Sequence, residues 1–188
     1  ADYLLIDPIL GTIDDFRTLV SEAQARGIVL ILDGVFNHMS SDSMNFDRYH
    51  RFDTLGACES PDSEFRSWFY FDETPVAGGA CNGGDGTFVN YTSWFGFDTI
   101  PKLNAFDRTA RAYFVRGDNS VERTWLREGA LGWRLDVAGD IDNGRDPANT
   151  YWENFRTVAR FENPEAVVIG EEREVAGAGI AVILVARL

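Results

Sequence analysis

Three apolar runs, each with a carboxylate at its C-terminal end, constrain the fold more than any other feature of this sequence. The runs cover residues 28–32, 131–137 and 166–169, and the carboxylates are Asp33, Asp136 and Glu171. The first run is typical of a strand buried on both faces of a parallel sheet and the third of another buried strand, whereas 131–137 predicts a strand with polar residues, Arg134 and Asp136, near its C-terminal end. Segments with helical periodicity separate them, so the sequence predicts an α/β fold with right-handed βα connections. Because parallel strands end at one edge of a sheet, we expect the three carboxylates to mark a functional site.

Capping residues and a 3.6-residue apolar period predict the helices. Thr12 with Asp15 three residues later is typical of a capping box, and Gly27 stops that helix. Ser120 is the expected N-cap of a helix over 121–128, which follows a shorter helical stretch at 109–115. The apolar residues at helical spacing are Phe16, Leu19, Val20 and Ala23 in the first helix, and Tyr151, Trp152, Phe155, Val158 and Ala159 in the last.

Residues 39 to about 98 have a different character, rich in Ser, Asp, Gly and aromatic residues and without a sustained period. A segment of this length inside a compact domain is usually functional or forms a small subdomain. Its aromatic runs at 68–71 and 94–97 suit the apolar faces of sugars, but we expect most of these rings to form the core of the segment itself. Cys58 and Cys81 also lie here, as one disulfide or as two free thiols.

The charge balance excludes some classes of partner. The chain has 17 basic and 30 acidic residues, a formal net charge of −13, which disfavours nucleic acid and anionic membrane surfaces. We find no signal-peptide pattern at Ala1, and the longest apolar stretch, 180–186, is too short for a membrane span. The sequence assigns no cellular location and no oligomeric state.

The carboxylates near the strand ends suggest a reaction class. Arg134 lies two positions before Asp136, on the same side of the strand, and is expected to keep that carboxylate ionised and oriented. Glu171 ends the next βα unit, so both carboxylates can meet in one cavity. Two carboxyl groups about 5 Å apart, one ionised and one protonated, are what retaining glycoside hydrolysis requires. The alternative is a structural Arg–Asp pair with a solvated glutamate.

Three further polar residues follow or end the first run. Asp33 is expected to be structural, through hydrogen bonds. Asn37 offers a carbonyl oxygen that suits a hard cation such as calcium. His38 is either a structural histidine or part of the site.

Five motifs in order give the sequence a family resemblance. Asp33-Gly-Val-Phe-Asn37-His38, Gly132-Trp-Arg134-Leu-Asp136-Val-Ala and Ile169-Gly170-Glu171 resemble three motifs of the α-amylase family, glycoside hydrolase family 13. Ile100-Pro101-Lys102-Leu103-Asn104 resembles an extra motif of its neopullulanase, cyclomaltodextrinase and maltogenic amylase branch, and Ile6-Asp7-Pro8 with Gly11-Thr12 fits the stretch after the second strand of the family's barrel. The resemblance covers residues 1 to about 172.

This resemblance implies a central fragment of a (β/α)₈ TIM barrel, from about strand 2 to strand 5. Residues 1–38 and 99–172 would belong to the barrel, 39–98 to a B-domain insertion after strand 3, and 173–188 to an atypical tail. Asp136 would be the nucleophile and Glu171 the general acid/base, with Arg134 orienting Asp136 and His38 binding the sugar. Asn37 matches a calcium ligand of many members. The implied substrates are α-glucans or maltooligosaccharides.

The sequence also departs from the family. A third catalytic aspartate belongs in a His-Asp pair, but the two histidines, His38 and His50, precede Met39 and Arg51. Arg173 replaces a tryptophan, and the following tail resembles a frameshifted or truncated reading frame. A whole barrel needs about 250 residues. We therefore expect little activity from the chain alone, and two alternatives stay open: a transglycosylase or isomerase of the same family, and a non-catalytic carbohydrate-binding relative.

Overall fold

A computed structural model describes residues 2–72, 74–141, 150–172 and 182–187. It divides the chain into two compact units. One unit comprises residues 3–35 and 111–188, and the other comprises residues 36–110 with the first two residues of the chain.

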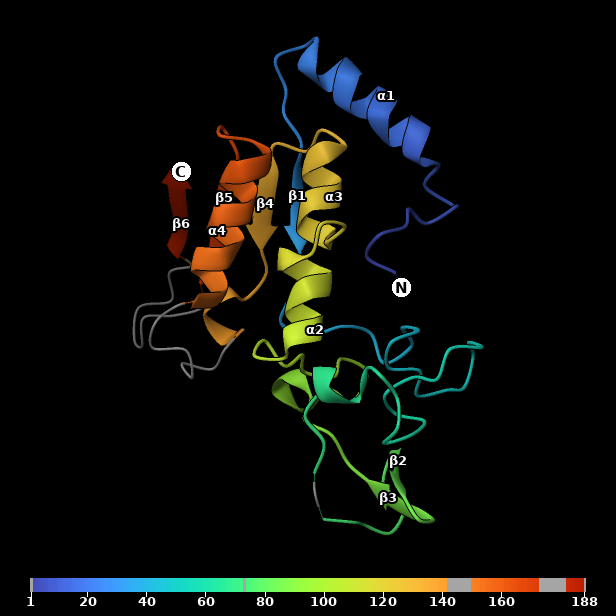
Figure 1. Cartoon of the computed structure of the whole chain (residues 1–188). Helices are drawn as coiled ribbons and strands as arrows, with labels where there is room; N and C mark the ends of the chain where they lie inside the picture. Colours follow the sequence, from blue (N-terminus) through green and yellow to red (C-terminus); the bar gives the residue numbers. More distant parts are fainter. Residues whose placement is uncertain (1, 73, 142–149, 173–181, 188) are drawn as a thin grey trace. The chain divides into compact units, whose positions relative to one another are not determined.

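The first unit is built on a four-stranded sheet with the order β1-β4-β5-β6 (Figure 1). Its strands are β1 (Ile31–Gly34), β4 (Gly132–Leu135), β5 (Val167–Glu172) and β6 (Val182–Arg187). β1, β4 and β5 are parallel, which confirms the predicted α/β class, whereas β6 pairs antiparallel with β5. The sequence analysis assigned no strand to this part of the tail, and residues 173–181 and 188 lie outside the described residues.

The helices of this unit follow the predicted boundaries closely. They include α1 (Ile13–Gln24), α3 (Val121–Arg127) and α4 (Thr150–Glu162), with a π-helical segment, η3 (Ala112–Arg116), before α3 and a short 3-10 helix, η4 (Ala138–Asp140), after β4. The capping box at α1 is confirmed: Asp15 N donates to Thr12 Oγ1 at 3.3 Å, and Thr12 N donates to Asp15 Oδ2 at 2.8 Å. Ser120 caps α3 through its hydroxyl oxygen, as expected. No described helix has the length and apolarity of a membrane span.

The core of the first unit lies between α3, α4 and the sheet. Four of the five predicted residues of α4 are buried, namely Tyr151, Phe155, Val158 and Ala159. On β4, Trp133 and Leu135 are also buried. The Phe155 ring contacts the Trp133 ring, with centroids 6.4 Å apart.

The prediction of a strand buried on both faces is wrong for the first apolar run. Ile28, Val29 and Ile31 are 55%, 51% and 37% exposed. The strand itself begins only at Ile31. β1 is at the edge of the sheet, so on one side it has no neighbouring strand among the described residues. An edge strand leaves apolar side chains exposed that a central strand would bury.

The second unit has little regular structure beyond a hairpin and a few short helices. The hairpin pairs β2 (Cys81–Gly84) with β3 (Thr87–Val89), the 3-10 helices are η1 (Arg66–Trp68) and η2 (Trp94–Gly96), and α2 (Arg108–Arg111) spans the boundary with the first unit. An aromatic core forms around Phe46, whose ring meets Phe69 and Tyr91 edge-on at 4.8 and 4.7 Å. Most of the predicted aromatic core is therefore present, although Phe95 and Phe97 are exposed.

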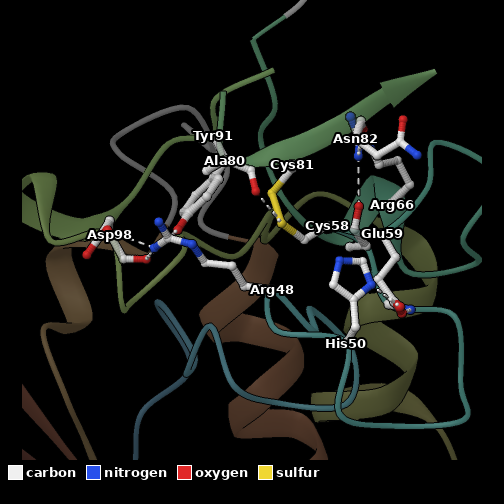
Figure 2. The surroundings of a disulfide bond; sticks show 12 residues. Arg48, His50, Cys58, Glu59, Arg66, Ala80, Cys81, Asn82, Tyr91 and Asp98 are labelled. Carbon is white, nitrogen blue, oxygen red and sulfur yellow. Dashed lines mark hydrogen bonds and ion pairs between the residues drawn. A yellow bond between two sulfur atoms is a disulfide. The ribbon is translucent and has the colours of Figure 1, made fainter. Parts of the chain in front are cut away.

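A disulfide joins Cys58 to Cys81, the first of the two alternatives left open by the sequence (Figure 2). Arg66 lies beside it and donates to the carbonyl oxygens of Ala57 and Asn82 at 2.8 and 3.0 Å. Its guanidinium carbon also lies 3.4 Å from the ring centroid of Phe71, a cation–π contact. The disulfide and Arg66 together tie the hairpin to the preceding loop.

Candidate active site

The parallel register of the sheet brings four charged residues together. Asp33 on β1 lies directly opposite Arg134 on β4. Arg134 in turn lies opposite Ile169, two residues before Glu171 on β5. Asp136 follows β4, with its backbone N–H donating to Gly34 O at 3.1 Å. The sheet edge predicted from the three apolar runs therefore carries all three carboxylates.

One guanidinium contacts all three carboxylates. Arg134 Nη1 lies 2.6 Å from Asp33 Oδ1 and 3.0 Å from Asp136 Oδ1, and Arg134 Nη2 lies 2.8 Å from Glu171 Oε2. These contacts raise the pKa of Arg134 further, chiefly through the hydrogen bond to Asp33. Arg134 thus fixes the positions of two carboxyl groups on neighbouring strands relative to each other.

Arg134 acts on Asp136 in the expected direction, because its hydrogen bond and its charge both lower the pKa of that carboxyl, but other influences outweigh it. Burial raises the pKa of the Asp136 carboxyl, and the hydrogen bond to Glu171 raises it further, whereas Arg134 lowers it. The net effect is a pKa of Asp136 above its ordinary value, set by burial and by the neighbouring Glu171 carboxyl.

Val137 has a strained backbone beside this pair, a feature that sequence reasoning missed. Its φ of 41° places a β-branched residue in the left-handed region. This conformation directs the Val137 N–H to Glu171 Oε2, at 3.2 Å. Strain of this kind is frequent at functional sites.

Tyr3 is another neighbour of the carboxylates that the motifs did not indicate. Its hydroxyl donates to Val35 O at 2.8 Å, and its backbone carbonyl accepts from Trp125 Nε1 at 2.8 Å. Burial is the main cause of its strongly raised pKa, and the charge of Asp136 contributes. A neutral phenol therefore lies within electrostatic range of Asp136.

Asn37 and His38 belong to the second unit and lie against a segment close to its C-terminal end. Leu103 N donates to Asn37 O at 2.9 Å, and His38 forms an antiparallel bridge with Lys102. The His38 ring stacks on Trp94, with centroids 4.8 Å apart and planes at 15°. Lys102 lies within the 100–104 motif, which alone indicates no role for it, and it is the chain's one lysine.

The surroundings of Asn37 do not fit a calcium ion. Its side-chain oxygen accepts a hydrogen bond from Lys102 Nζ, so a cationic group already faces the oxygen that calcium would need. Among the described residues, no group of three or more His, Cys, Asp or Glu side chains is arranged to hold a metal.

Comparison with known proteins identifies the class. The family model of the α-amylase catalytic domain matches residues 1–178, and the chain belongs to this family of glycoside hydrolases. Amylopullulanase from Thermoanaerobacterium saccharolyticum is 36% identical over 185 residues, covering 91% of this chain and 13% of that protein. Neopullulanase 2 from Thermoactinomyces vulgaris is 35% identical over 172 residues, covering 91% of this chain and 25% of that protein.

A solved structure gives the same result. Cyclic α-maltosyl-(1→6)-maltose hydrolase from Arthrobacter globiformis, in complex with its named sugar, aligns with a TM-score of 0.69 and 31% identity. The alignment covers 91% of this chain and 33% of that protein. The chain thus spans a quarter or less of the length of the two curated relatives and a third of this structure.

Proposed function

We propose that this chain carries the nucleophile and the general acid/base of a retaining glycoside hydrolase that acts on α-glucosidic bonds of starch-like glucans or maltooligosaccharides. The observation that carries the proposal is the position of Arg134, which contacts both Asp136 and Glu171 at neighbouring strand ends. A structural ion pair requires one carboxylate, whereas two carboxyl groups held side by side at neighbouring strand ends suit acid and nucleophile roles.

The proposed reaction has two steps. Asp136 attacks the anomeric carbon while the glycosidic C–O bond breaks and Glu171 gives its proton to the leaving oxygen. The Glu171 carboxylate then takes a proton from water, which attacks the same carbon and releases Asp136. Arg134 orients Asp136 in both steps, Asp33 holds Arg134, and His38 binds the sugar.

The domain assignment remains part of this proposal. Residues 1–38 and 99–172 would form barrel strands 2 to 5 with their helices, and residues 39–98 would form the B domain. Backbone pairing between the start of the insertion and the residues just after it supports this: Met39 N donates to Pro101 O at 3.2 Å, and Ser41 N donates to Thr99 O at 2.9 Å. These bonds close the insertion at its base.

Covalent trapping tests the proposal in single-turnover form, which suits a chain without a His-Asp pair. The Glu171→Gln variant is incubated with α-maltosyl fluoride, whose fluoride leaves without an acid. We expect an intact-mass increase of one maltosyl group, located on Asp136 by peptide mapping. Asp136→Asn is the control and forms no adduct.

The other candidate function is that of a non-catalytic carbohydrate-binding relative. Calorimetric binding of maltooligosaccharides without any adduct at Asp136 would favour that alternative and overturn the catalytic assignment. Adduct formation followed by sugar transfer to an added acceptor, instead of to water, would indicate the transglycosylase alternative.

A further inference from the structure

Lys102 is unusual in both number and location. It is the one lysine among the 17 basic residues of the chain, and it is only 4% exposed. Burying an ammonium group is unfavourable unless hydrogen bonds replace its hydration. The groups that Lys102 contacts therefore determine why a lysine is tolerated there.

The contact with Asn37 fixes the orientation of a buried amide. The Asn37 side chain is fully buried, and its Oδ1 accepts from Lys102 Nζ. A lysine ammonium can only donate, so the oxygen of the amide must face Lys102 and the Nδ2 group must face the opposite way. Asn37 Nδ2 lies 3.2 Å from His38 Nδ1.

This orientation determines the tautomer of His38. Asn37 Nδ2 is a donor, so His38 Nδ1 must be the acceptor, and the proton of the neutral imidazole must be on Nε2. Stacking on Trp94 fixes the plane of the same ring. Lys102, Asn37 and Trp94 together leave His38 with one orientation and one tautomer.

We propose that Lys102 is a positioning residue that replaces a metal ion at Asn37 and, through Asn37, holds His38 as an Nε2–H donor. The assignment of a sugar hydroxyl as the acceptor of that donor rests on the proposed function. The expected tautomer of His38 and the expected absence of calcium at Asn37 do not depend on the proposed function, because both are measured without turnover.

The two histidines of the chain make the test simple. Protein labelled with ¹⁵N-histidine is examined by NMR on the alkaline side of the imidazole pKa. We expect His38 to show an unprotonated Nδ1 and a protonated Nε2. His50 provides an internal contrast, because its Nδ1 lies 2.8 Å from Glu59 Oε1 and must donate to that carboxylate (Figure 2). The His50→Gln variant assigns the signals.

Asn37→Asp is the decisive variant. It keeps an oxygen facing Lys102 but presents a second oxygen, which can only accept, to His38. We expect the Nδ1 of His38 to become protonated in this variant. In Lys102→Met, which keeps the apolar stem but cannot donate, we expect a mixture of tautomers. A protonated Nδ1 in the unmodified chain, or an unchanged Nδ1 signal in Asn37→Asp, would overturn the proposal.

Calcium provides an independent readout. Labelling with ¹⁵N-lysine gives a single side-chain ammonium signal, from Lys102. We expect calcium chloride or a chelator to leave the Lys102 and His38 signals in place. A calcium-dependent shift of both signals would show that the ion displaces Lys102 from Asn37, which contradicts the replacement.

Discussion

Asp33 and Arg134 lie directly opposite each other on neighbouring parallel strands, and their side chains meet at 2.6 Å, the shortest of the three carboxylate contacts of Arg134. This contact anchors one side of the guanidinium. The other contacts, to Asp136 and Glu171, then fall where the proposed nucleophile and acid/base must be. Asp33 therefore acts on the site through Arg134.

We predict that Asp33→Ala slows adduct formation at Asp136 about 10- to 100-fold, because small displacements of reacting groups cost rates of this order. The effect on stability should be below about 1 kcal/mol, since the Asp33 side chain is 61% exposed and exposed ion pairs contribute little. The rate is read from the trapping experiment and the stability from thermal unfolding.

Asp14→Ala is the matched control, because Asp14 forms a similar but distant pair with Arg17 at 3.0 Å. It should change neither the rate nor the stability appreciably. An Asp33→Ala variant that traps the sugar as fast as the parent chain would show that Arg134 does not need this anchor.

The contrast between local and distant contacts explains what the sequence could predict. The Thr12–Asp15 box and the Arg134–Asp136 pair depend on spacing of three and two residues, so both could be inferred. The direction of the Asp136 pKa shift could not be inferred from the sequence. It is set by burial and by the proximity of Glu171, and both of these arise from the tertiary fold. The hydrogen-bond partner of the Asn37 side chain, Lys102, is 65 residues away in the sequence. Only the tertiary fold brings these two residues together, so the contact could not be inferred from local spacing.

The strand predictions show the same limit. An apolar run indicates that a segment can be buried, but the neighbours in the sheet decide whether it is. The run in β4 is buried between two strands, whereas the run before β1 is exposed at the edge. The antiparallel pairing of β6 also depends on the register of the sheet and not on a local motif.

Glu122 on α3 is fully buried, and burial raises the pKa of its carboxyl from 4.5 to about 10. Below pH 4.5 the carboxyl is protonated in both the folded and the unfolded chain. Between that value and about 10, only the unfolded chain releases the proton, so the stability should fall as the pH rises. We predict that Glu122→Gln raises the free energy of unfolding at neutral pH and flattens this dependence, in urea unfolding over the pH range.

Glu128→Gln is the control with the opposite sign. Its hydrogen bond to Arg17 lowers the pKa of Glu128, so the glutamate stabilises the fold above its unfolded pKa and loses that contribution as the pH falls. A parent chain whose stability rises between neutral and alkaline pH, with no change in Glu122→Gln, would contradict a buried, protonated Glu122.

Two phenylalanines on α4 separate core packing from surface effects. Phe155 is fully buried against Trp133 and Trp152, whereas Phe161 is 76% exposed. We predict that Phe155→Ala lowers the free energy of unfolding by about 3–5 kcal/mol, through lost burial and the cavity left behind. Phe161→Ala, measured in the same denaturant series, should cost less than about 1 kcal/mol. Equal losses in the two variants would mean that α4 packs with a different face.

The disulfide gives the last prediction. Cys58 and Cys81 are 23 residues apart, and closing a loop of about this size restricts the unfolded chain. We predict that the Cys58→Ser/Cys81→Ser double variant lowers the free energy of unfolding of the second unit by about 2–4 kcal/mol. Dithiothreitol should lower the melting temperature of the parent chain but leave the double variant unchanged.

Because Arg66 still holds Ala57 and Asn82, the aromatic core around Phe46 should persist in the double variant, which near-ultraviolet circular dichroism checks. A parent chain that is insensitive to the reductant, with free thiols detected by mass spectrometry, would show that the two cysteines do not form the bond.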